Sequence, residues 1–431
     1  MHSRKFPHPA KIVTDPIYDC IEITPVLPLV ETPEFQALAE KRQLSLTSLA
    51  FPSATHSRLS HSIGAYHATR ILADRWVRLK IVTEAEGDAM CVHGLLHDIG
   101  HPAFSHVVED LCPYDHKKRT TELVAGLKQI TESCGVDHDL VLRLVRHEHP
   151  LWTVVADKNI GTEKLDYLER DGLFTGQGRP MGISALRNYV YFRDNTLVID
   201  SKVSDAAMDT QTFYMKMFKN VYFRKSLVIA QRMFKKMVHH LILENEIRSE
   251  DLFGFTDPDL VARFIASRSP VVRTLFSLLR ERKLFKEAIV LRPQAFADET
   301  RIIDKPIRVI KLSDSEMRRI TASPSLQMYA HADLEALEDR IADAIGLPQG
   351  EVLLVPVFNP ERFQAQDVKV LYGDQHEIES LRNTRPGHFA AMEETAHSYT
   401  AFRICTLNGH RTYLSSPEIA DRATSLIFSA T

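Results

Sequence analysis

Apolar residues recur three and four positions apart through most of the first 290 residues. Between Ser57 and Trp76 this spacing places His61, Ala65 and Leu72 on one helical face. The same period predicts further helices over residues 84–99, 117–134, 138–146, 161–174, 210–246, 257–268 and 270–282. A short hairpin at residues 11–24 and a helix start at Thr32 and Pro33 precede them. The pattern therefore predicts a mainly α fold for this part of the chain.

The pattern changes after about residue 290. Short runs rich in β-branched residues predict strands at residues 301–303, 307–312, 352–358, 368–372 and 401–405. Helical patterns remain at residues 334–344 and 417–428. We therefore expect a helical domain over residues 1–290 and a smaller α+β C-terminal lobe over residues 291–431, with a regulatory or oligomerisation role.

Composition narrows the class of protein. A chain of 431 residues with 44 % hydrophobic and 25 % charged residues can bury a large core. A formal net charge of -3 gives no general attraction to nucleic acid or to anionic membranes. The five cysteines form no CxxC pair, and no run approaches the roughly 18 apolar residues that a membrane-spanning helix needs. We therefore expect a cytoplasmic protein that does not bind membranes, and nucleic acid is not indicated.

Residues that could bind a metal ion or transfer a proton cluster in the sequence around the doublet His97-Asp98. Eleven of the 20 histidines lie between His56 and His149. Burying a carboxylate without a partner costs roughly several kcal/mol of free energy, and a bound metal ion would remove that cost. Imidazole nitrogen together with carboxylate oxygen suits a borderline first-row ion. The alternative is a salt-bridged aspartate beside a core histidine, which is the usual explanation for an isolated His-Asp pair.

Three separated motifs resemble one family. They are Ser57-Arg58-Leu-Ser-His61, His97-Asp98-Ile-Gly-His101-Pro-Ala-Phe-Ser-His106 and Glu163-Lys164-Leu-Asp166-Tyr167-Leu-Glu-Arg-Asp171. In this order they resemble the signatures of the HD-domain dNTP triphosphohydrolases, which include the human enzyme with SAM and HD domains and its bacterial relatives. The resemblance implies an HD-domain helical core with the smaller α+β lobe behind it.

The resemblance implies the ligands of a divalent metal ion. By position these are His61, His97, Asp98 and Glu163. The family has an aspartate where this chain has Glu163, and the longer side chain shifts the carboxylate. Asp166 is the alternative fourth ligand. The ion could be Mn, Fe, Mg or Zn.

The resemblance also implies residues for the nucleotide. Those expected to bind substrate are Gln43, Leu44, Arg58, Lys164, Tyr167, Asp171 and Arg224. Gln43 and Leu44 correspond to the pair that selects deoxyribose in the family, and Asp171 fits a surface position on an amphipathic helix equally well. His101, His106, Glu109 and His116 are the expected catalytic set, with His106 as general acid and Glu109 orienting its ring.

The implied reaction is hydrolysis of a deoxynucleoside triphosphate to deoxynucleoside and inorganic triphosphate. Two alternatives stay open: an HD phosphohydrolase acting on another nucleotide, and a nucleotide sensor with low turnover that works through a partner protein. We expect a homo-oligomer, either dimer or tetramer, and a nucleotide activator is possible. The positions that bind the activator in the family hold Glu31, Gln36 and Ala39 here, which disfavours a guanine-specific activator.

Overall fold

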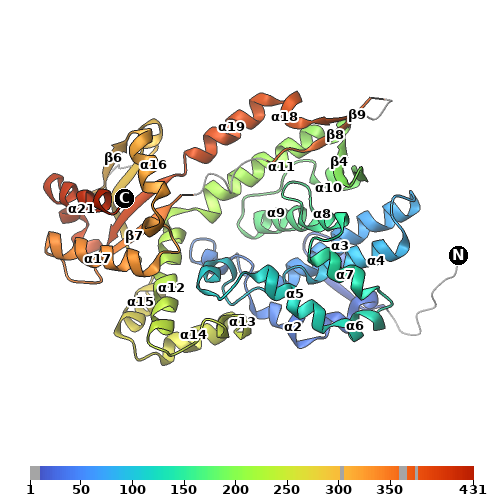
Figure 1. Cartoon of the computed structure of the whole chain (residues 1–431), viewed down its shortest axis with the longest axis horizontal. Coiled ribbons are helices and arrows are strands. Elements are labelled where there is room, and N and C mark those ends of the chain that lie inside the picture. The colour runs from blue at the N-terminus through green and yellow to red at the C-terminus, as the bar shows by residue number, and fades with distance from the viewer. Residues whose placement is uncertain (1–9, 301–304, 359–365, 374–376) are drawn as a thin grey trace. The chain divides into compact units, whose positions relative to one another are not determined.

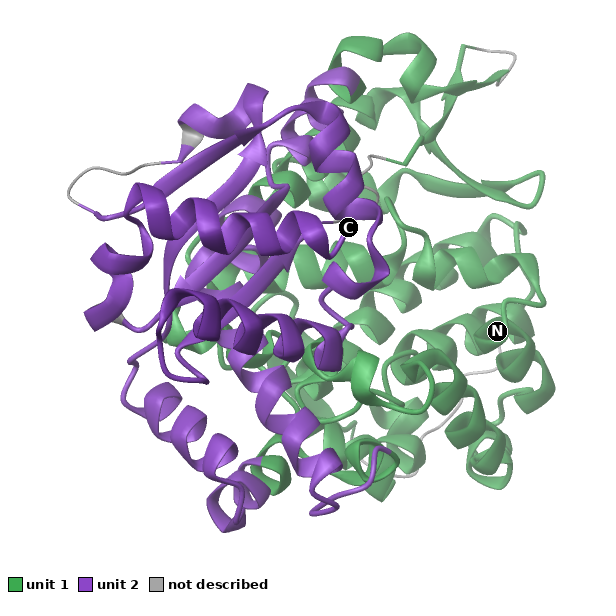
Figure 2. Ribbon diagram, turned by 60° about the vertical axis from the view of Figure 1, so that its left-hand side comes forward, with its two compact units in different colours: residues 1–217, 250–260, 365–389 green, residues 218–249, 261–364, 390–431 purple. Residues whose placement is uncertain are grey.

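The computed structural model describes residues 10–300, 305–358, 366–373 and 377–431 (Figure 1). The chain divides into two compact units, coloured green and purple in Figure 2. Unit 1 contains residues 1–217, 250–260 and 365–389, and unit 2 contains residues 218–249, 261–364 and 390–431. Each unit therefore draws on segments that are distant in the sequence. The boundary expected near residue 290, between a helical domain and an α+β lobe, stays a prediction.

Three helices form the centre of unit 1. They are α3 (Arg58–Arg78), α4 (Glu84–Leu96) and α9 (Thr162–Phe174), and α3 packs against both of the others. Leu72 and Trp76 of α3 are buried in this contact region, as their helical spacing predicts. The other helices wholly within unit 1 are α1 (Leu27–Val30), α2 (Pro33–Gln36), α5 (His116–Gly126), α6 (Lys128–Ser133), α7 (His138–Val145), α8 (Thr153–Ala156), α10 (Ile183–Asn188), α11 (Ser204–Met217), α13 (Asp251–Gly254) and α18 (Leu381–Thr384).

Unit 1 also holds two small sheets. β1 (Ile12–Asp15) and β2 (Asp19–Glu22) form an antiparallel hairpin. A four-stranded sheet has the order β3-β4-β8-β9, from β3 (Val190–Arg193), β4 (Thr196–Asp200), β8 (Lys369–Tyr372) and β9 (Glu377–Ser380). β4 and β8 pair in parallel, with Ile199 opposite Val370. A segment near the C-terminus thus completes a sheet of the first unit.

Unit 2 packs helices on a four-stranded sheet of order β6-β5-β10-β7. Its strands are β5 (Lys286–Pro293), β6 (Arg308–Leu312), β7 (Val352–Val357) and β10 (Ala401–Thr406). Leu354 and Phe402 of this sheet share a buried cluster with Ile341 and Ile427 from two of the helices. The helices wholly within unit 2 are α12 (Lys225–Leu243), α15 (Pro270–Arg280), α16 (Asp314–Ala322), α17 (His331–Ile345), α20 (Arg411–Leu414) and α21 (Pro417–Ser429). Helices α14 (Asp257–Ala266) and α19 (Pro386–His397) run from unit 1 into unit 2.

The mainly α fold class with a smaller sheet-containing C-terminal part is confirmed. Two predicted helices are interrupted: the one over residues 117–134 breaks at Leu127, and the one over residues 210–246 contains a π-helical turn at Phe218–Tyr222 before α12. Strands β3, β4, β5 and β9 were not predicted. β5 is buried along most of its length and therefore shows no polar alternation. The strand expected at residues 301–303 lies outside the described residues.

In the described part of the chain, no helix combines the length and the apolar character needed to cross a membrane.

Candidate functional site

The first turn of α3 contributes two of the predicted site residues. Ser57 caps the helix by accepting a hydrogen bond from the Ser60 amide at 3.3 Å. Arg58 and His61 follow directly, and both are buried. A side-chain Cβ at Gly64, one turn later, would overlap the Asp166 carboxylate and the Arg170 guanidinium. Gly64 therefore allows α9 to bring these charges next to His61.

The end of α4 supplies His97 and Asp98. His97 is the C-cap of the helix, and its Nδ1 donates to the Gly94 carbonyl at 2.8 Å. A Cβ at Gly100 would overlap the backbone of α5 at His116 and Thr120. The chain therefore leaves the helix at a point where His97 and Asp98 are fixed and α5 can approach closely.

The structure brings His61, His97 and Glu163 together. One possible ligand atom from each lies within 4.8 Å of the other two. The Nε2 atoms of His61 and His97 are 3.2 Å apart. Asp98 lies beside them, 3.8 Å from His61 Nε2 and 3.4 Å from His97 Nε2. These are the four residues that the family resemblance implies as ligands, and their role as ligands stays a prediction.

The hydrogen bonds of the two imidazoles test whether a cation fits here. His61 Nδ1 faces the Asp166 carboxylate at 2.8 Å, and His97 Nδ1 faces a carbonyl, so both Nδ1 atoms carry the proton. In the neutral rings both Nε2 lone pairs then point at one another. A proton or a cation must lie between them. Two imidazole nitrogens with two carboxylates are a suitable donor set for a divalent first-row ion.

Asp166 is engaged elsewhere. Arg170 donates to both of its oxygens, at 2.9 and 2.8 Å, and also donates to Asp15 at 2.7 Å. Burial acts to raise the pKa of Asp166, but Arg170 and His61 outweigh it and hold the pKa well below the ordinary value. Asp166 therefore stays ionised and orients His61 through Nδ1. This arrangement favours Glu163 over Asp166 as the fourth ligand.

Asp98 is shared between cationic and imidazole partners. Arg58 Nη1 donates to its Oδ2, and His101 Nε2 lies 3.2 Å from its Oδ1. Burial acts to raise the pKa of Asp98, but Arg58, His97 and His101 hold the pKa well below its usual value. The carboxylate is therefore available as an anionic ligand throughout the neutral range.

The loop after Asp98 is held by residues that the sequence analysis missed. Phe104 and Ser105 both have left-handed backbone conformations, with φ of 55° and 53°, which costs on the order of 1 kcal/mol or more for each non-glycine residue. Asp257 accepts from the Phe104 amide at 2.7 Å, and Ser45 donates to the Phe104 carbonyl at 2.8 Å. Lys41 donates to the His101 carbonyl at 2.6 Å. These partners are distant in sequence, so no local pattern marks them.

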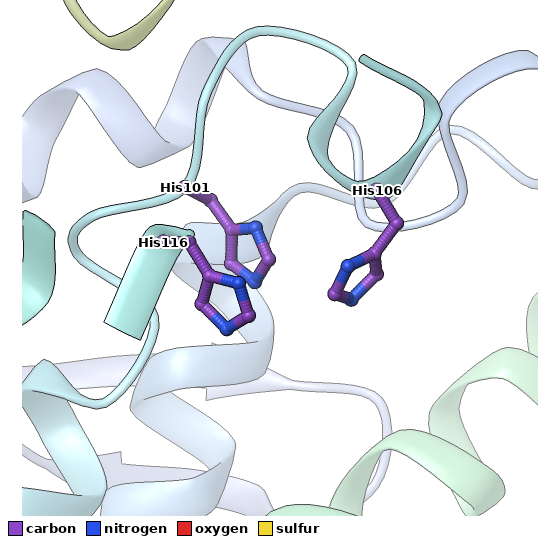
Figure 3. Close-up of side chains that lie close together, drawn as sticks. All are labelled: His101, His106 and His116. Atoms are coloured by element: carbon purple, nitrogen blue, oxygen red, sulfur yellow. The ribbon is translucent and has the colours of Figure 1, made fainter. Parts of the chain in front are cut away.

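His101, His106 and His116 form a second cluster (Figure 3). The rings of His101 and His116 are stacked, with centroids 3.9 Å apart, and the His106 ring meets His101 edge-on at 4.7 Å. Glu109 accepts from Nδ1 of both His106, at 2.8 Å, and His116. Burial acts to raise the pKa of Glu109, but these two hydrogen bonds hold the pKa below its ordinary value.

The residues expected to bind nucleotide differ in their surroundings. Gln43 has a buried Oε1 with no hydrogen-bond partner among the described residues, and Leu44 next to it is half-buried. Tyr167 is half-buried, with its ring centroid 6.2 Å from that of His61. Asp171 is buried and lies 2.9 Å from His56, which the sequence analysis did not select.

The two remaining predicted cations are also placed. Lys164 is buried, donates to the Lys158 carbonyl at 2.5 Å and lies 3.5 Å from the centre of the Tyr214 ring. Burial lowers the pKa of Lys164 to about 7. Arg224 belongs to unit 2, where it is the N-cap residue of α12. Substrate binding by these residues stays a prediction.

Comparison with known proteins identifies the domain that contains most of these residues. The model of the HD domain matches residues 58–171, and that of the HD associated region matches residues 184–311. A phosphohydrolase from Bacteroides thetaiotaomicron has a similar structure, with a TM-score of 0.68 and 20 % identity, over 92 % of this chain and all of that one. At this identity the likeness concerns the fold.

Two sequence relatives show how far the similarity extends. An uncharacterized protein of Methanocaldococcus jannaschii is 27 % identical over 65 % of this chain and 59 % of its own length. The deoxynucleoside triphosphate triphosphohydrolase SAMHD1 of Danio rerio is 39 % identical over 44 % of this chain and 32 % of its own length. The chain thus spans less than two thirds of these relatives. The HD-domain match covers Arg58 to Asp171, which is all of the three motifs except Ser57. The chain belongs to the HD-domain proteins, with an HD domain followed by an HD-associated region.

Proposed function

We propose that this protein is a metal-dependent phosphohydrolase that cleaves deoxynucleoside triphosphates to deoxynucleoside and inorganic triphosphate. The dependence on a metal ion rests on one observation. The Nε2 atoms of His61 and His97 lie 3.2 Å apart, and both Nδ1 atoms donate to acceptors. Asp98 and Glu163 complete the donor set. The match to the HD domain, which begins at Arg58 and ends at Asp171, supports the same assignment.

The deoxynucleotide substrate rests on two supports. One is the ordered set of motifs shared with the family, together with the SAMHD1 relative from Danio rerio, whose name states this activity. The other is Gln43, whose buried Oε1 lacks a partner among the described residues. A sugar 3′-hydroxyl would satisfy this acceptor, and the adjacent Leu44 would then oppose a 2′-hydroxyl. Tyr167 and Asp171 are proposed to contact the sugar as well.

The negative charge of the triphosphate needs cations. Arg58 holds Asp98 and also donates through Nε to Ser105 at 2.5 Å. A metal ion at Asp98 would compete with the guanidinium for that carboxylate and leave Arg58 donors for a phosphate oxygen. Lys164 needs to leave its carbonyl partner to act in the same way, and a phosphate would favour its charged form. Arg224 is proposed for the same purpose by family likeness alone.

A bound divalent ion supplies Lewis-acid polarisation of the α-phosphate and lowers the pKa of a water molecule. Asp166 holds the ring of His61 and the Gly94 carbonyl holds the ring of His97, so both Nε2 atoms would be available to hold such an ion. Water adds its oxygen to the α-phosphorus and releases one proton to solvent, and the bond from phosphorus to the 5′-oxygen breaks. His106 protonates that oxygen, while Glu109 stabilises the imidazolium form that carries the proton.

The assembly and regulation of the protein belong to the same proposal. A homo-oligomer and a nucleotide activator are proposed on family likeness alone, without a specific observation. The identity of the ion among Mn, Fe, Mg and Zn is left open by a mixed nitrogen and oxygen donor set. An HD phosphohydrolase acting on another nucleotide and a low-turnover sensor are the two outcomes that would replace the proposed activity.

Ion-exchange chromatography of products tests the proposal. The purified full chain, loaded with Mn²⁺, is incubated separately with dNTPs, NTPs and a cyclic dinucleotide. We expect deoxynucleoside and intact triphosphate from dNTPs, no turnover by His97→Ala, and unchanged turnover by His397→Ala, which alters an exposed histidine outside the site. Cleavage of the other nucleotides in preference to dNTPs would overturn the substrate assignment, and tight dNTP binding without product would indicate a sensor.

A further inference from the structure

We propose that His101, His106 and His116 form a second divalent metal site, separate from the one at His61 and His97. Each residue offers one ring nitrogen, and the three nitrogens lie within 4.8 Å of one another. The side chains come from the loop after α4 and from the first residue of α5 (Figure 3). We call this group the histidine triad.

A single carboxylate orients two members of the triad. Glu109 accepts from Nδ1 of His106 at 2.8 Å and from Nδ1 of His116, and its Oε1 also accepts from the His116 amide at 3.1 Å. These contacts place the protons on Nδ1 and leave the Nε2 lone pairs as metal donors. A carboxylate that fixes the tautomer of a ligating histidine is the usual outer partner of a metal site.

The third member has a nitrogen available for a ligand. His101 is 1 % exposed, and its Nε2 lies 3.2 Å from Asp98. Its Nδ1 is buried without a hydrogen-bond partner in the part of the chain that the structure describes. A buried polar atom left in this state costs about 1–3 kcal/mol, and a metal bond would satisfy it.

The loop that carries the triad is held before any ion binds. Lys41 fixes the His101 carbonyl, and Asp257 and Ser45 fix the backbone at Phe104. The side chain of His106 is 63 % exposed, so an ion can reach the triad from solvent. Rigid ligands with a route to solvent are the conditions that a preformed metal site requires.

The ligand types select the class of ion. Three imidazoles without a ligating carboxylate suit Zn²⁺, Co²⁺ or Ni²⁺, whereas Mg²⁺ prefers oxygen ligands. Three protein ligands also leave coordination positions open for water or an anion. The site at His61 and His97 differs, because Asp98 and Glu163 add two carboxylates to its donor set. The two sites should therefore differ in their preference for Zn²⁺ over Mn²⁺.

The second ion has a consequence for catalysis that rests on the proposed function. The same Nε2 of His106 that would bind the ion must carry a proton when His106 acts as general acid. The two roles exclude one another. Occupation of the triad by Zn²⁺ should therefore inhibit turnover supported by Mn²⁺ at the first site.

Counting bound ions tests the site without any use of activity. Full-length protein is stripped with chelator, dialysed against Zn²⁺ and analysed for metal per chain. We expect two ions in the native chain and in His397→Ala, and one ion in either His106→Ala or His97→Ala. Circular dichroism confirms folding, and His106→Ala is suited to the test because its side chain is largely exposed. One ion in the native chain, or two in His106→Ala, would overturn the proposal.

Glu109→Gln separates inhibition at the triad from replacement of the first ion. The variant should bind the second Zn²⁺ 10–100-fold more weakly and shift the inhibitory Zn²⁺ concentration upward by the same factor. An unchanged inhibitory concentration would place the inhibiting ion at the first site and refute the inhibitory role. If the second ion is counted but turnover is not inhibited, the metal site stands and the general-acid role of His106 in the proposed function falls.

Discussion

Each unit has a buried carboxylate that accepts from positive side chains, Asp166 in unit 1 and Glu338 in unit 2, and the two clusters differ in one donor. In unit 1, Asp166 accepts from Arg170 at both oxygens and from His61 Nδ1 at 2.8 Å. In unit 2, Glu338 lies 3.2 Å from Arg232 and 2.7 Å from Lys236, and also accepts from the Leu354 amide at 2.9 Å. Both carboxylates are almost completely buried.

The two clusters differ in whether a donor to the carboxylate has a second atom that can bind a ligand. Every donor to Glu338 is a fixed cation or a backbone amide, so the cluster ties α12, α17 and β7 together. His61 has a second nitrogen, 3.2 Å from that of His97. We therefore expect Asp166 to act in the candidate site through His61, and Glu338 to have a structural role.

The largest expected effect comes from removing the arginine of each cluster. Arg170→Met leaves Asp166 without its arginine and should destabilise the protein by about 3–5 kcal/mol. Arg232→Met leaves Glu338 with Lys236 at 2.7 Å and should destabilise the protein by less. Only Arg170→Met should also lower the metal content, because Asp166 then loses its position against His61. Urea unfolding and metal analysis on both variants measure the two effects. Equal metal loss in both variants would remove the distinction between the clusters.

Neutral replacements of the carboxylates sharpen the comparison. Asp166→Asn keeps the shape but weakens the orientation of His61, and we expect 10–100-fold lower affinity for the ion at the first site. Glu338→Gln should lower stability and leave that affinity unchanged. Titration with Mn²⁺ after chelator treatment provides the measurement. An Asp166→Asn protein with native affinity would show that Asp166 has only a structural role.

A smaller loss of stability is expected from a substitution at the close approach of α9 to α3. In Gly64→Ala the added methyl group would overlap Asp166 and Arg170, so overpacking should cost about 1–3 kcal/mol. Gly126→Ala is the matched control, because no atom lies within 4 Å of a Cβ built there. Thermal unfolding of both variants tests the expectation. A native midpoint for Gly64→Ala would mean that α9 can shift without strain.

The last expected effect is a pH dependence at Lys164, whose side chain donates to the Lys158 carbonyl and not to a carboxylate oxygen. Burial lowers the pKa of Lys164 from 10.5 to about 7, opposed by the charges of Asp157 and Glu163. Between these values the unfolded chain binds more protons, so the free energy of unfolding should rise with pH by at most about 1.4 kcal/mol per unit. Below about pH 7 both the folded and the unfolded chain bind the proton, so this dependence of stability on pH ends there.

Urea unfolding at several pH values measures this dependence. Lys164→Met should have a shallower rise between pH 7 and 10.5 than the native chain. Identical slopes for Lys164→Met and the native chain would show that Lys164 is protonated in the folded protein.

Local sequence was sufficient for the central helices of unit 1 and for the first contacts of the site, but not for α16 and α19. The helical face of α3 and the caps at Thr32 and Ser57 are decided by residues three or four positions apart, and the structure confirms them. His97 and Asp98 were selected because a charged pair at the end of an apolar segment needs a partner. The structure places His61 beside them.

The parts that were missed depend on residues far apart in the chain. Asp15 reaches Arg170, Lys41 reaches His101, and Asp257 reaches Phe104, and no periodicity links such pairs. The left-handed backbone at Phe104 was also unpredictable, because phenylalanine has no preference for that conformation. The pairing of β4 with β8 joins strands that are distant in sequence.

The most direct test of the central claim uses water labelled with ¹⁸O. Manganese-loaded protein is incubated with a dNTP in labelled water, and both products are analysed by mass spectrometry. Attack on the α-phosphorus predicts one labelled oxygen in inorganic triphosphate, none in the deoxynucleoside, and no products from His97→Ala. Label in a monophosphate or diphosphate product, or undiminished release of triphosphate by His97→Ala, would contradict the account.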